Sequence, residues 1–283
     1  MQRSLRRSFT TAAWLGWQIE SNWTDPLMFF TFSLLKPIAS VMILIFMYNA
    51  VSRTGTNDPI YAYIYLGNAF YIYVSAVMAG VSFSILDDRE RYRTLKYLYI
   101  APINVPIYLV GRAVARFVIG TIAVLITIAA GVLFFDVPVN LAQIDWLLLL
   151  GAMALGLLCL GLMGITLGLW TLTIRSEPWF IGEGFAAAMY LFSGAIFPIT
   201  LLPSALQPIG FALPLTYWLE LVRRALLGPG ADAFPTLAGF SNGQLVAILA
   251  GITLVFGLIT LAGYRFFDRI ARERGMIDIQ SNF

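Results

Sequence analysis

The stretch from residue 87 to residue 101 carries a dense mixture of charged and aromatic side chains between two apolar segments. We expect a short helix here, with Asp87 and Asp88 in its first turn, where the helix dipole favours acidic groups. A charged face and an aromatic face on one short helix suit docking onto a soluble protein. A solvated turn that only reverses the chain is the alternative. The residues that would make the contact are Asp87, Asp88, Glu90, Arg91, Tyr92, Thr94, Leu95, Tyr99 and Pro102, with Tyr92, Leu95 and Tyr99 on one face and Pro102 ending the helix.

Residues for acid–base, thiol or metal chemistry are scarce. The 283 residues include no His and one Cys, Cys159, so His-based proton transfer and an internal disulfide are excluded, and a zinc site is not expected. The Gly-x-x-x-x-Gly-Lys-Ser/Thr loop that cradles nucleotide phosphates is absent. A net charge of +3 is too small to indicate nucleic-acid binding. We therefore expect a non-catalytic chain that itself binds no cofactor, metal or nucleic acid.

The composition indicates a membrane protein. Hydrophobic residues make up 59% of the chain and charged residues 12%, against about 45–50% and about 25% in soluble domains. A hydrocarbon core takes about 20 apolar residues of helix. The sequence therefore predicts an all-α polytopic membrane protein with six transmembrane helices within residues 25–268. The windows are 26–51, 59–86, 117–135, 146–174, 184–198 and 233–264. The third helix is expected to begin before its window, with Arg112 and Arg116 in its first turns.

The positions of Lys and Arg predict the orientation, because basic residues concentrate on the cytosolic side of membrane proteins. With the N-terminus inside, Arg53, Arg223 and Arg224 face outward, and the other fifteen of the 18 Lys and Arg residues face the cytosol. Both termini, including the tail 269–283, are then cytosolic, and the chain crosses the cell (inner) membrane several times.

Residues 1–24 are predicted to form an amphipathic helix that lies in the cytosolic membrane interface. Leu5, Phe9, Ala12, Ala13 and Trp17 recur at helical spacing, opposite Arg3, Arg6 and Arg7.

The segment 199–228 is uncharged until Glu220 and is broken by several prolines, so we expect re-entrant helices on the outer side, between spans five and six. Irregular backbone at membrane depth needs shielding by protein or by a water-filled cavity. The segment is therefore a candidate exit gate, and a static plug that anchors span six is the alternative. Its residues are Pro198, Pro203, Pro214, Glu220, Arg223 and Arg224, and Glu220 can reach both arginines along a helix.

Two further features could contact a transported molecule. Tyr61 and Tyr65 share a stripe at the outer start of span two, where tyrosines form either a stacking surface or an ordinary interfacial belt. Glu183 lies near the cytosolic start of span five, where it could contact substrate or regulate opening. A carboxylate that reaches back to the interface is the alternative.

The order of these motifs resembles the ABC-2-type permease family, the membrane half of many bacterial ATP-driven exporters, including drug-resistance-type permeases. The resemblance covers essentially the whole chain. A Gly commonly precedes the family's Thr, where this chain has Arg93. The matching residues are Glu90, Thr94-Leu95, Pro102 and Gly111 in the first patch, and Ser193 to Pro198 followed by Leu213 to Tyr217 in the second.

The resemblance implies that residues 87–101 are a coupling helix seated on a separate ATP-binding subunit, present in two copies, which would carry ATP and Mg. A second permease subunit, identical or homologous, would complete the pathway. The implied activity is export of a drug, lipid or apolar peptide, with a lipid-linked polysaccharide as the alternative substrate. A secondary transporter or channel that needs no ATPase is the alternative from a different class. Ion-coupled transporters usually carry ionisable residues in the middle of their spans, and the spans here are nearly free of charge at their centres, which argues against that class.

Overall fold

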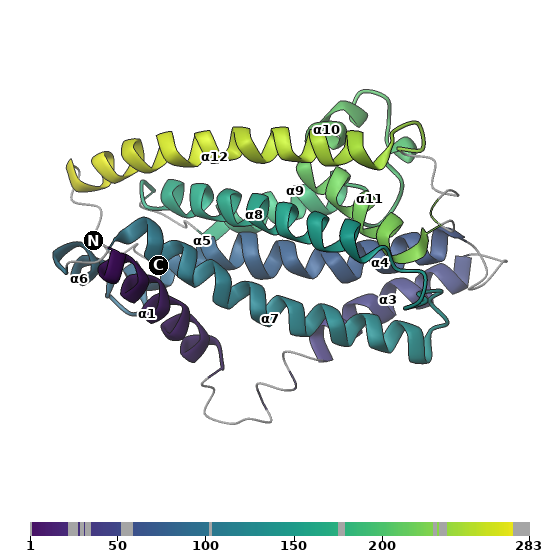
Figure 1. The fold of residues 1–283 in the computed structure, drawn as a ribbon, viewed down its shortest axis with the longest axis horizontal. Coiled ribbons are helices and arrows are strands. Elements are labelled where there is room, and N and C mark those ends of the chain that lie inside the picture. Colours follow the sequence, from purple (N-terminus) through teal and green to yellow (C-terminus); the bar gives the residue numbers. More distant parts are fainter. Residues whose placement is uncertain are drawn as a thin grey trace.

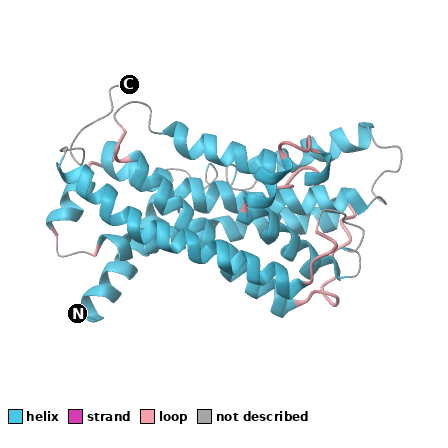
Figure 2. Cartoon of the chain, turned by 90° about the horizontal axis from the view of Figure 1, so that it is seen from above, coloured by secondary structure: helices cyan, strands magenta, loops and turns pink. Residues whose placement is uncertain are grey.

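The helices of the chain lie side by side along one long axis (Figure 1). The computed structural model describes residues 2–21, 28, 31, 35–51, 59–101, 104–174, 179–228, 231 and 237–273. Within these ranges the chain is almost entirely helical and contains no β-strand (Figure 2). The predicted all-α class is therefore confirmed for the described part of the chain.

Among the described residues, four helices are long and apolar enough to cross a membrane. Their spanning parts contain 31, 30, 26 and 26 residues, more than the about 20 that a hydrocarbon core requires. They coincide with the predicted windows that begin at residues 59, 117, 146 and 233, so the chain is a multi-pass membrane protein. The elements are a continuous rod made of α4 (Pro59–Tyr73), η3 (Val74–Ala79) and α5 (Gly80–Glu90), followed by α7 (Val105–Phe134), α8 (Trp146–Thr171) and α12 (Asn242–Glu273).

The other two predicted spans are shorter. The first corresponds to α3 (Lys36–Val51) with 16 residues, and the fifth to α9 (Trp179–Phe192) with 14 residues. At about 1.5 Å per residue, α9 is about 21 Å long, against about 30 Å for a hydrocarbon core. Helix length supports four spans, and six spans remain a prediction.

Two of the long helices begin at a polar cap. The side chain of Asn104 accepts a hydrogen bond from the Ile107 N–H at 3.3 Å, and that of Asp145 accepts one from the Leu148 N–H at 3.0 Å. Because α7 already begins at Val105, Arg112 and Arg116 lie about two and three turns inside it. The expectation that they stand in its first turns was wrong.

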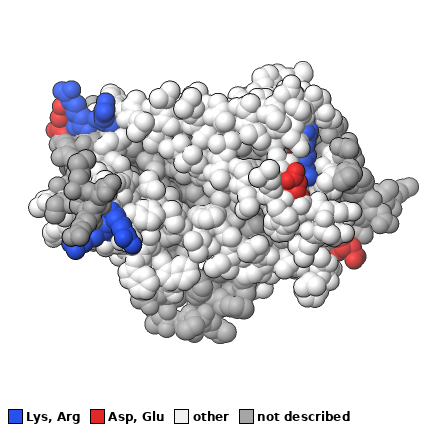
Figure 3. All heavy atoms as spheres, in the orientation of Figure 1, with Lys and Arg blue, Asp and Glu red and all other residues white. Residues whose placement is uncertain are grey.

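Charges gather at the two ends of the bundle, and the middle of the face seen in Figure 3 is uncharged. We call the end that holds Arg89, Arg112 and Arg265 the basic end. The opposite end, which holds Asp145 and Arg224, is the far end. Helices α5 and α12 finish at the basic end, and α7 starts there, as Figure 1 shows. An apolar layer between two polar ends is the pattern of a membrane-spanning bundle.

The main core forms where α11 (Pro214–Leu227) wedges between α4 and α8. Its Trp218 is 1% exposed and meets Phe70 and Tyr73 edge to face, with ring centroids 6.0 and 5.9 Å away. A side chain at Gly156 of α8 would collide with the Trp218 indole, so the glycine is what lets the ring approach. This packing fixes the far half of the bundle.

The middle of the long rod is a π-helix, η3, which the sequence pattern did not predict. The N–H of Gly80 donates to the carbonyls of Ser75 and Val77 at its end. A π-helical stretch accommodates an extra residue inside an α-helix and is frequent at functional sites.

Candidate functional site

The acidic pair Asp87–Asp88 lies in the last turn of α5 and not in the first turn of a new helix, so that expectation was wrong. The short helix that follows, α6 (Leu95–Ile100), begins only after a turn at residues 91–94. Helix α5 runs past the first charged residue because Asp88 and its neighbour Arg89 both find buried partners on other helices. Pro102 lies outside the described residues, as does the side chain of Tyr99.

The turn between α5 and α6 is held by the backbone of the acidic pair. The Tyr92 N–H donates to the Asp87 carbonyl at 2.8 Å, and the Thr94 N–H donates to the Asp88 carbonyl at 2.8 Å. Between them, Arg93 has a φ of 54°, in the left-handed region that favours glycine. Arg93 therefore stands where a Gly commonly precedes the Thr, and its backbone still adopts the conformation that favours glycine.

The surface of α6 and its turn differs from the expected aromatic face. Leu95 is only 4% exposed and packs into the basic end, whereas Tyr92 lies in the turn and points to solvent, so these two residues do not share a face. Among the described side chains of α6, the exposed ones are Tyr97 at 62% and Ile100 at 81%, which sequence reasoning missed. Exposed cations stand beside the rings, since the Arg91 guanidinium lies 5.5 Å from the ring centroid of Tyr92.

Asp88 is buried against the start of α7. The Tyr108 hydroxyl donates to its Oδ2 at 2.7 Å, and the Arg112 Nη2 lies 3.8 Å from its Oδ1. Both side chains of this ion pair are 2% exposed. Within the part of the chain that the structure describes, none of the three guanidinium nitrogens of Arg112 makes a hydrogen bond, an unusual state for a buried arginine.

Arg89 faces the other way, toward the end of α8. Its Nη1 donates to the carbonyls of Thr171, Leu172 and Ile174 at 3.4, 3.3 and 3.5 Å, and its Nη2 binds Glu90 at 2.6 Å. A cation at a helix C-terminus is favoured by the helix dipole. Adjacent residues of α5 thus join it to α7 and to α8.

The N-terminal helix, α1 (Gln2–Ser21), crosses α7 at the basic end (Figure 1). A Cβ on Gly111 would stand 2.7 Å from the Ala12 Cβ, and a Cβ on Gly16 would stand 2.8 Å from the Ala115 Cβ. Small residues four apart on both helices permit this close approach, as in membrane helix pairs. Arg6 and Arg7 remain exposed on the opposite side, as an amphipathic helix requires.

At the far end, every residue of α11 except Arg224 is buried. The predicted Glu220–Arg224 pair forms, with 3.0 Å between Nε and Oε1. Glu220 could also reach Arg223 along the helix, but Arg223 takes other partners. Its Nε donates to the Tyr63 carbonyl at 3.2 Å and its Nη2 to the Gly194 carbonyl at 2.9 Å, with the guanidinium 3.4 Å from the Tyr63 ring centroid. Backbone acceptors and an aromatic face therefore take the place of the carboxylate.

Arg224 ties α11 to the segment that leads into α12. It donates to the carbonyls of Leu237 and Phe240, both at 2.7 Å, and to the Asn242 side chain at 3.1 Å. Arg224 thereby holds the end of α11, the segment 237–240 and the start of α12 together.

The prolines of this segment separate short helices. Pro198 precedes η4 (Ile199–Leu201), Pro203 stands in the turn before α10 (Gln207–Ala212), and Pro214 opens α11. Pro214 lies beside Cys159 near the middle of α8, whereas Ala225 accepts a hydrogen bond from the Asp145 N–H at the start of α8. Helix α11 therefore runs along roughly the far half of α8, the course of a re-entrant element.

The three residues expected along a substrate pathway are not brought together. Tyr61 and Tyr65 are each 2% exposed. Tyr65 donates to the Thr127 carbonyl of α7 at 2.6 Å, and Tyr61 donates to the carbonyl of Phe135, the residue after α7, at 2.8 Å. Glu183 is exposed on α9, next to Gly182, which neighbours Ser82 in the basic half of the rod. The tyrosines therefore belong to the far-end core and the carboxylate to an open face.

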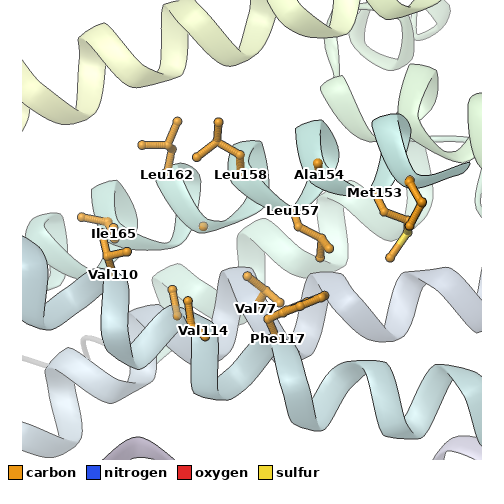
Figure 4. A pocket seen from close by; sticks show the side chains of 13 residues that line it. Val77, Val110, Val114, Phe117, Met153, Ala154, Leu157, Leu158, Leu162 and Ile165 are labelled. Atoms are coloured by element: carbon orange, nitrogen blue, oxygen red, sulfur yellow. The ribbon is translucent and has the colours of Figure 1, made fainter. Parts of the chain in front are cut away.

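An apolar groove of about 480 Å³ runs between α7 and α8, with η3 at its floor. Val114 and Phe117 of α7 and Leu157 of α8 converge on it (Figure 4). Every lining residue is apolar, so the groove suits hydrocarbon. Within the described ranges, no Cys, Asp and Glu side chains are grouped as three or more metal ligands.

Comparison with known proteins identifies one family. The model of the ABC-2 type transporter family matches residues 10–227, well over half of the chain, and the match includes both buried charge clusters. A search of curated proteins finds no match to this sequence.

Proposed function

Because the chain belongs to the ABC-2 type transporter family, we propose that it is the membrane permease of an ATP-driven exporter of hydrophobic or amphipathic molecules. Members of this family are generally non-catalytic membrane components that work with an ATP-binding subunit. The direction of transport, the substrate class and the partner are the parts that we propose for this chain.

The observation that carries the proposal is the coupling segment, residues 87–101. Its short helix presents Tyr97 and Ile100 to solvent, and the Lys96 ammonium lies 5.7 Å from the Tyr97 ring centroid. The end of α5 that precedes it is fixed to α7 by Asp88 and to α8 by Arg89. An exposed surface of apolar and cationic side chains suits binding to a soluble protein. Because the adjoining end of α5 is held by buried contacts, force from such a partner would pass into the helix bundle. By the positive-inside rule, this end faces the cytosol, where the ATP-binding subunits, in two copies, would carry ATP and Mg.

An apolar substrate fits the described surfaces better than a sugar chain. The groove between α7 and α8 offers no hydrogen-bonding side chain. Tyr61 and Tyr65, the rings that could stack on sugars, have both their faces and their hydroxyls engaged in the core. A polysaccharide substrate is therefore the second candidate.

The exposed carboxylate of Glu183 supports a second permease subunit. An ionisable residue on a membrane helix normally faces protein or a water-filled cavity, whereas in the single chain Glu183 faces outward from α9. We propose that a second copy or a homologue covers this face and encloses the pathway.

The segment 199–228 would close the outer exit of that pathway. Arg223 links α11 to α4 and to the loop at Gly194, so an opening movement would carry these parts as one body. A permanent plug that anchors α12 through Arg224 is the alternative.

The test is co-purification from the native membrane. The proposal expects a stoichiometric subunit that carries a phosphate-binding loop. Ile100→Glu, at a site 81% exposed on α6, should release that subunit. Leu141→Glu, the same change at a site 71% exposed near the far end, should leave it bound. If no ATP-binding subunit is recovered in repeated preparations, the proposal fails and a secondary transporter or channel becomes the leading alternative.

A further inference from the structure

We propose that Tyr108 and Arg112 are positioning residues that carry movement of the coupling segment into α1 and α7 through Asp88. The inference rests on the proposed function, because it assigns a path for the force that an ATP-binding subunit would apply. The path is a chain of three direct contacts within the basic end.

The first contact joins the coupling segment to Asp88. Both the N–H and the hydroxyl of Thr94 donate to the Asp88 carbonyl, at 2.8 and 3.4 Å. A displacement of α6 therefore pulls on the backbone of Asp88 through two hydrogen bonds.

The second contact joins Asp88 to α7, and it is incomplete. Tyr108 makes a full hydrogen bond to one carboxylate oxygen at 2.7 Å, while Arg112 stops 3.8 Å from the other. A closed guanidinium–carboxylate pair has a separation of about 2.8 Å, so a movement of about 1 Å would complete it. The buried nitrogens of Arg112 have no other hydrogen-bond acceptor, and leaving such donors unpaired is costly. Two arrangements of the pair follow, the open one described here and a closed one.

The third contact joins the part of α7 around Arg112 to α1. Gly111 and Ala115, which flank Arg112, pack against Ala12 and Gly16 so closely that neither glycine has room for a Cβ. Because these small residues interlock the two helices, α1 and α7 would shift together when Arg112 moves toward Asp88.

Arg89 supplies the fixed point of this movement. Its guanidinium is already bonded to the carbonyls at the end of α8 and to Glu90. Helix α5 therefore stays attached to α8 on one side while its contact with α7 can close on the other.

The experiment measures this shift in the complex with the co-purified ATP-binding subunit. Spin labels go on cysteines that replace Thr11 of α1 and Leu261 of α12, both exposed, in a Cys159→Ala background. Electron–electron distances are recorded with and without a non-hydrolysable ATP analogue. The nucleotide should shift the distance in the otherwise unchanged chain. Tyr108→Phe and Arg112→Gln should reduce the shift at least fivefold while the ATP-binding subunit stays bound.

Two controls separate transmission from folding. Arg116→Gln changes the next arginine along α7, which donates to Ser84 at 3.4 Å, and should leave the shift intact. The double variant Asp88→Asn with Arg112→Gln removes both charges, so it should recover any melting temperature lost in Arg112→Gln without recovering the shift.

A normal shift in Arg112→Gln, or recovery of the shift in the double variant, would overturn this inference alone. If the unchanged chain shows no nucleotide-dependent shift although the ATP-binding subunit is bound, this inference fails, whereas the proposed function fails only if no ATP-binding subunit co-purifies.

Discussion

Each end of the bundle holds arginines beside an acidic residue, but the hydrogen bonding of Arg112 at the basic end differs from that of Arg223 and Arg224 at the far end. At the far end, Arg223 and Arg224 donate to backbone carbonyls, to a side-chain amide and to Glu220. At the basic end, Arg112 makes no hydrogen bond and stands 3.8 Å from Asp88. A charge cluster whose hydrogen bonds are all made holds its helices rigidly, whereas a cluster with unmade hydrogen bonds lets its helices move at little energetic cost. The comparison indicates an anchor at the far end and a joint at the basic end.

The largest expected effect is the loss of Arg223. Arg223→Met keeps an unbranched apolar stem but removes the guanidinium, which leaves the carbonyls of Tyr63 and Gly194 without a donor. We expect the free energy of unfolding to fall by about 3 kcal/mol. At the basic end, the double variant Asp88→Asn with Arg112→Met leaves no unpaired buried charge and keeps an acceptor for Tyr108, so it should cost only about 1 kcal/mol. Denaturant titration in detergent micelles measures both, and equal losses would remove the distinction between anchor and joint.

The next effect is steric. A methyl group at Gly67 of α4 would collide with the Ala195 carbonyl oxygen and the Arg223 guanidinium. Because that site is held rigidly, Gly67→Ala should cost about 2 kcal/mol of unfolding free energy. Gly151→Ala on α8 is the matched control, since nothing lies within 4 Å of the added Cβ there. It should be neutral or stabilising by up to about 1 kcal/mol. If Gly67→Ala is as well tolerated as the control, the far end is less rigid than its contacts imply.

A smaller effect separates the two interpretations of Tyr65. Tyr65→Phe removes only the hydrogen bond to the Thr127 carbonyl and should lower the unfolding free energy by about 1 kcal/mol. Transport preference should stay unchanged, because the ring is buried in the far-end core. A changed preference with unchanged stability, measured in reconstituted vesicles, would instead support the pathway interpretation.

The smallest effect is expected at the turn of the coupling segment. Arg93→Gly suits the φ of 54° but gains freedom in the unfolded chain, so the unfolding free energy should change by less than about 0.5 kcal/mol. Arg93→Val places a β-branched residue in the left-handed region and should cost about 1–2 kcal/mol. The same titration checks both variants, and a well-tolerated Val would mean that the turn can change its backbone conformation freely.

The four long spans could be predicted because the requirement of a hydrocarbon core acts along the sequence itself. Charge-free windows beginning at residues 59 and 146 match real helices for this reason. The pair Glu220–Arg224 was predictable for a similar reason, since four residues along a helix fix the distance.

Errors occurred where the deciding partner is distant in the sequence. Helix α5 was expected to end before Asp87, but it continues because Asp88 meets Tyr108 and Arg89 meets the end of α8. The sequence offered only Glu220 as a partner within reach of Arg223, because no local pattern reveals the carbonyls of Tyr63 and Gly194. The one signal that could have revealed the basic-end cluster is Arg112 itself, an arginine well inside an apolar helix.

The π-helix Val74–Ala79 has a consequence for how this protein could tolerate insertions and deletions. Each residue of an α-helix turns the chain by about 100°, and the wider turn of η3 absorbs one extra residue within the rod. Deleting one residue from η3 would therefore restore a regular helix and leave Asp88 facing Tyr108 and Arg89 facing the end of α8. The same deletion within α5 would rotate both side chains away from these partners, so the rod should tolerate the loss of a residue only in its π-helical middle.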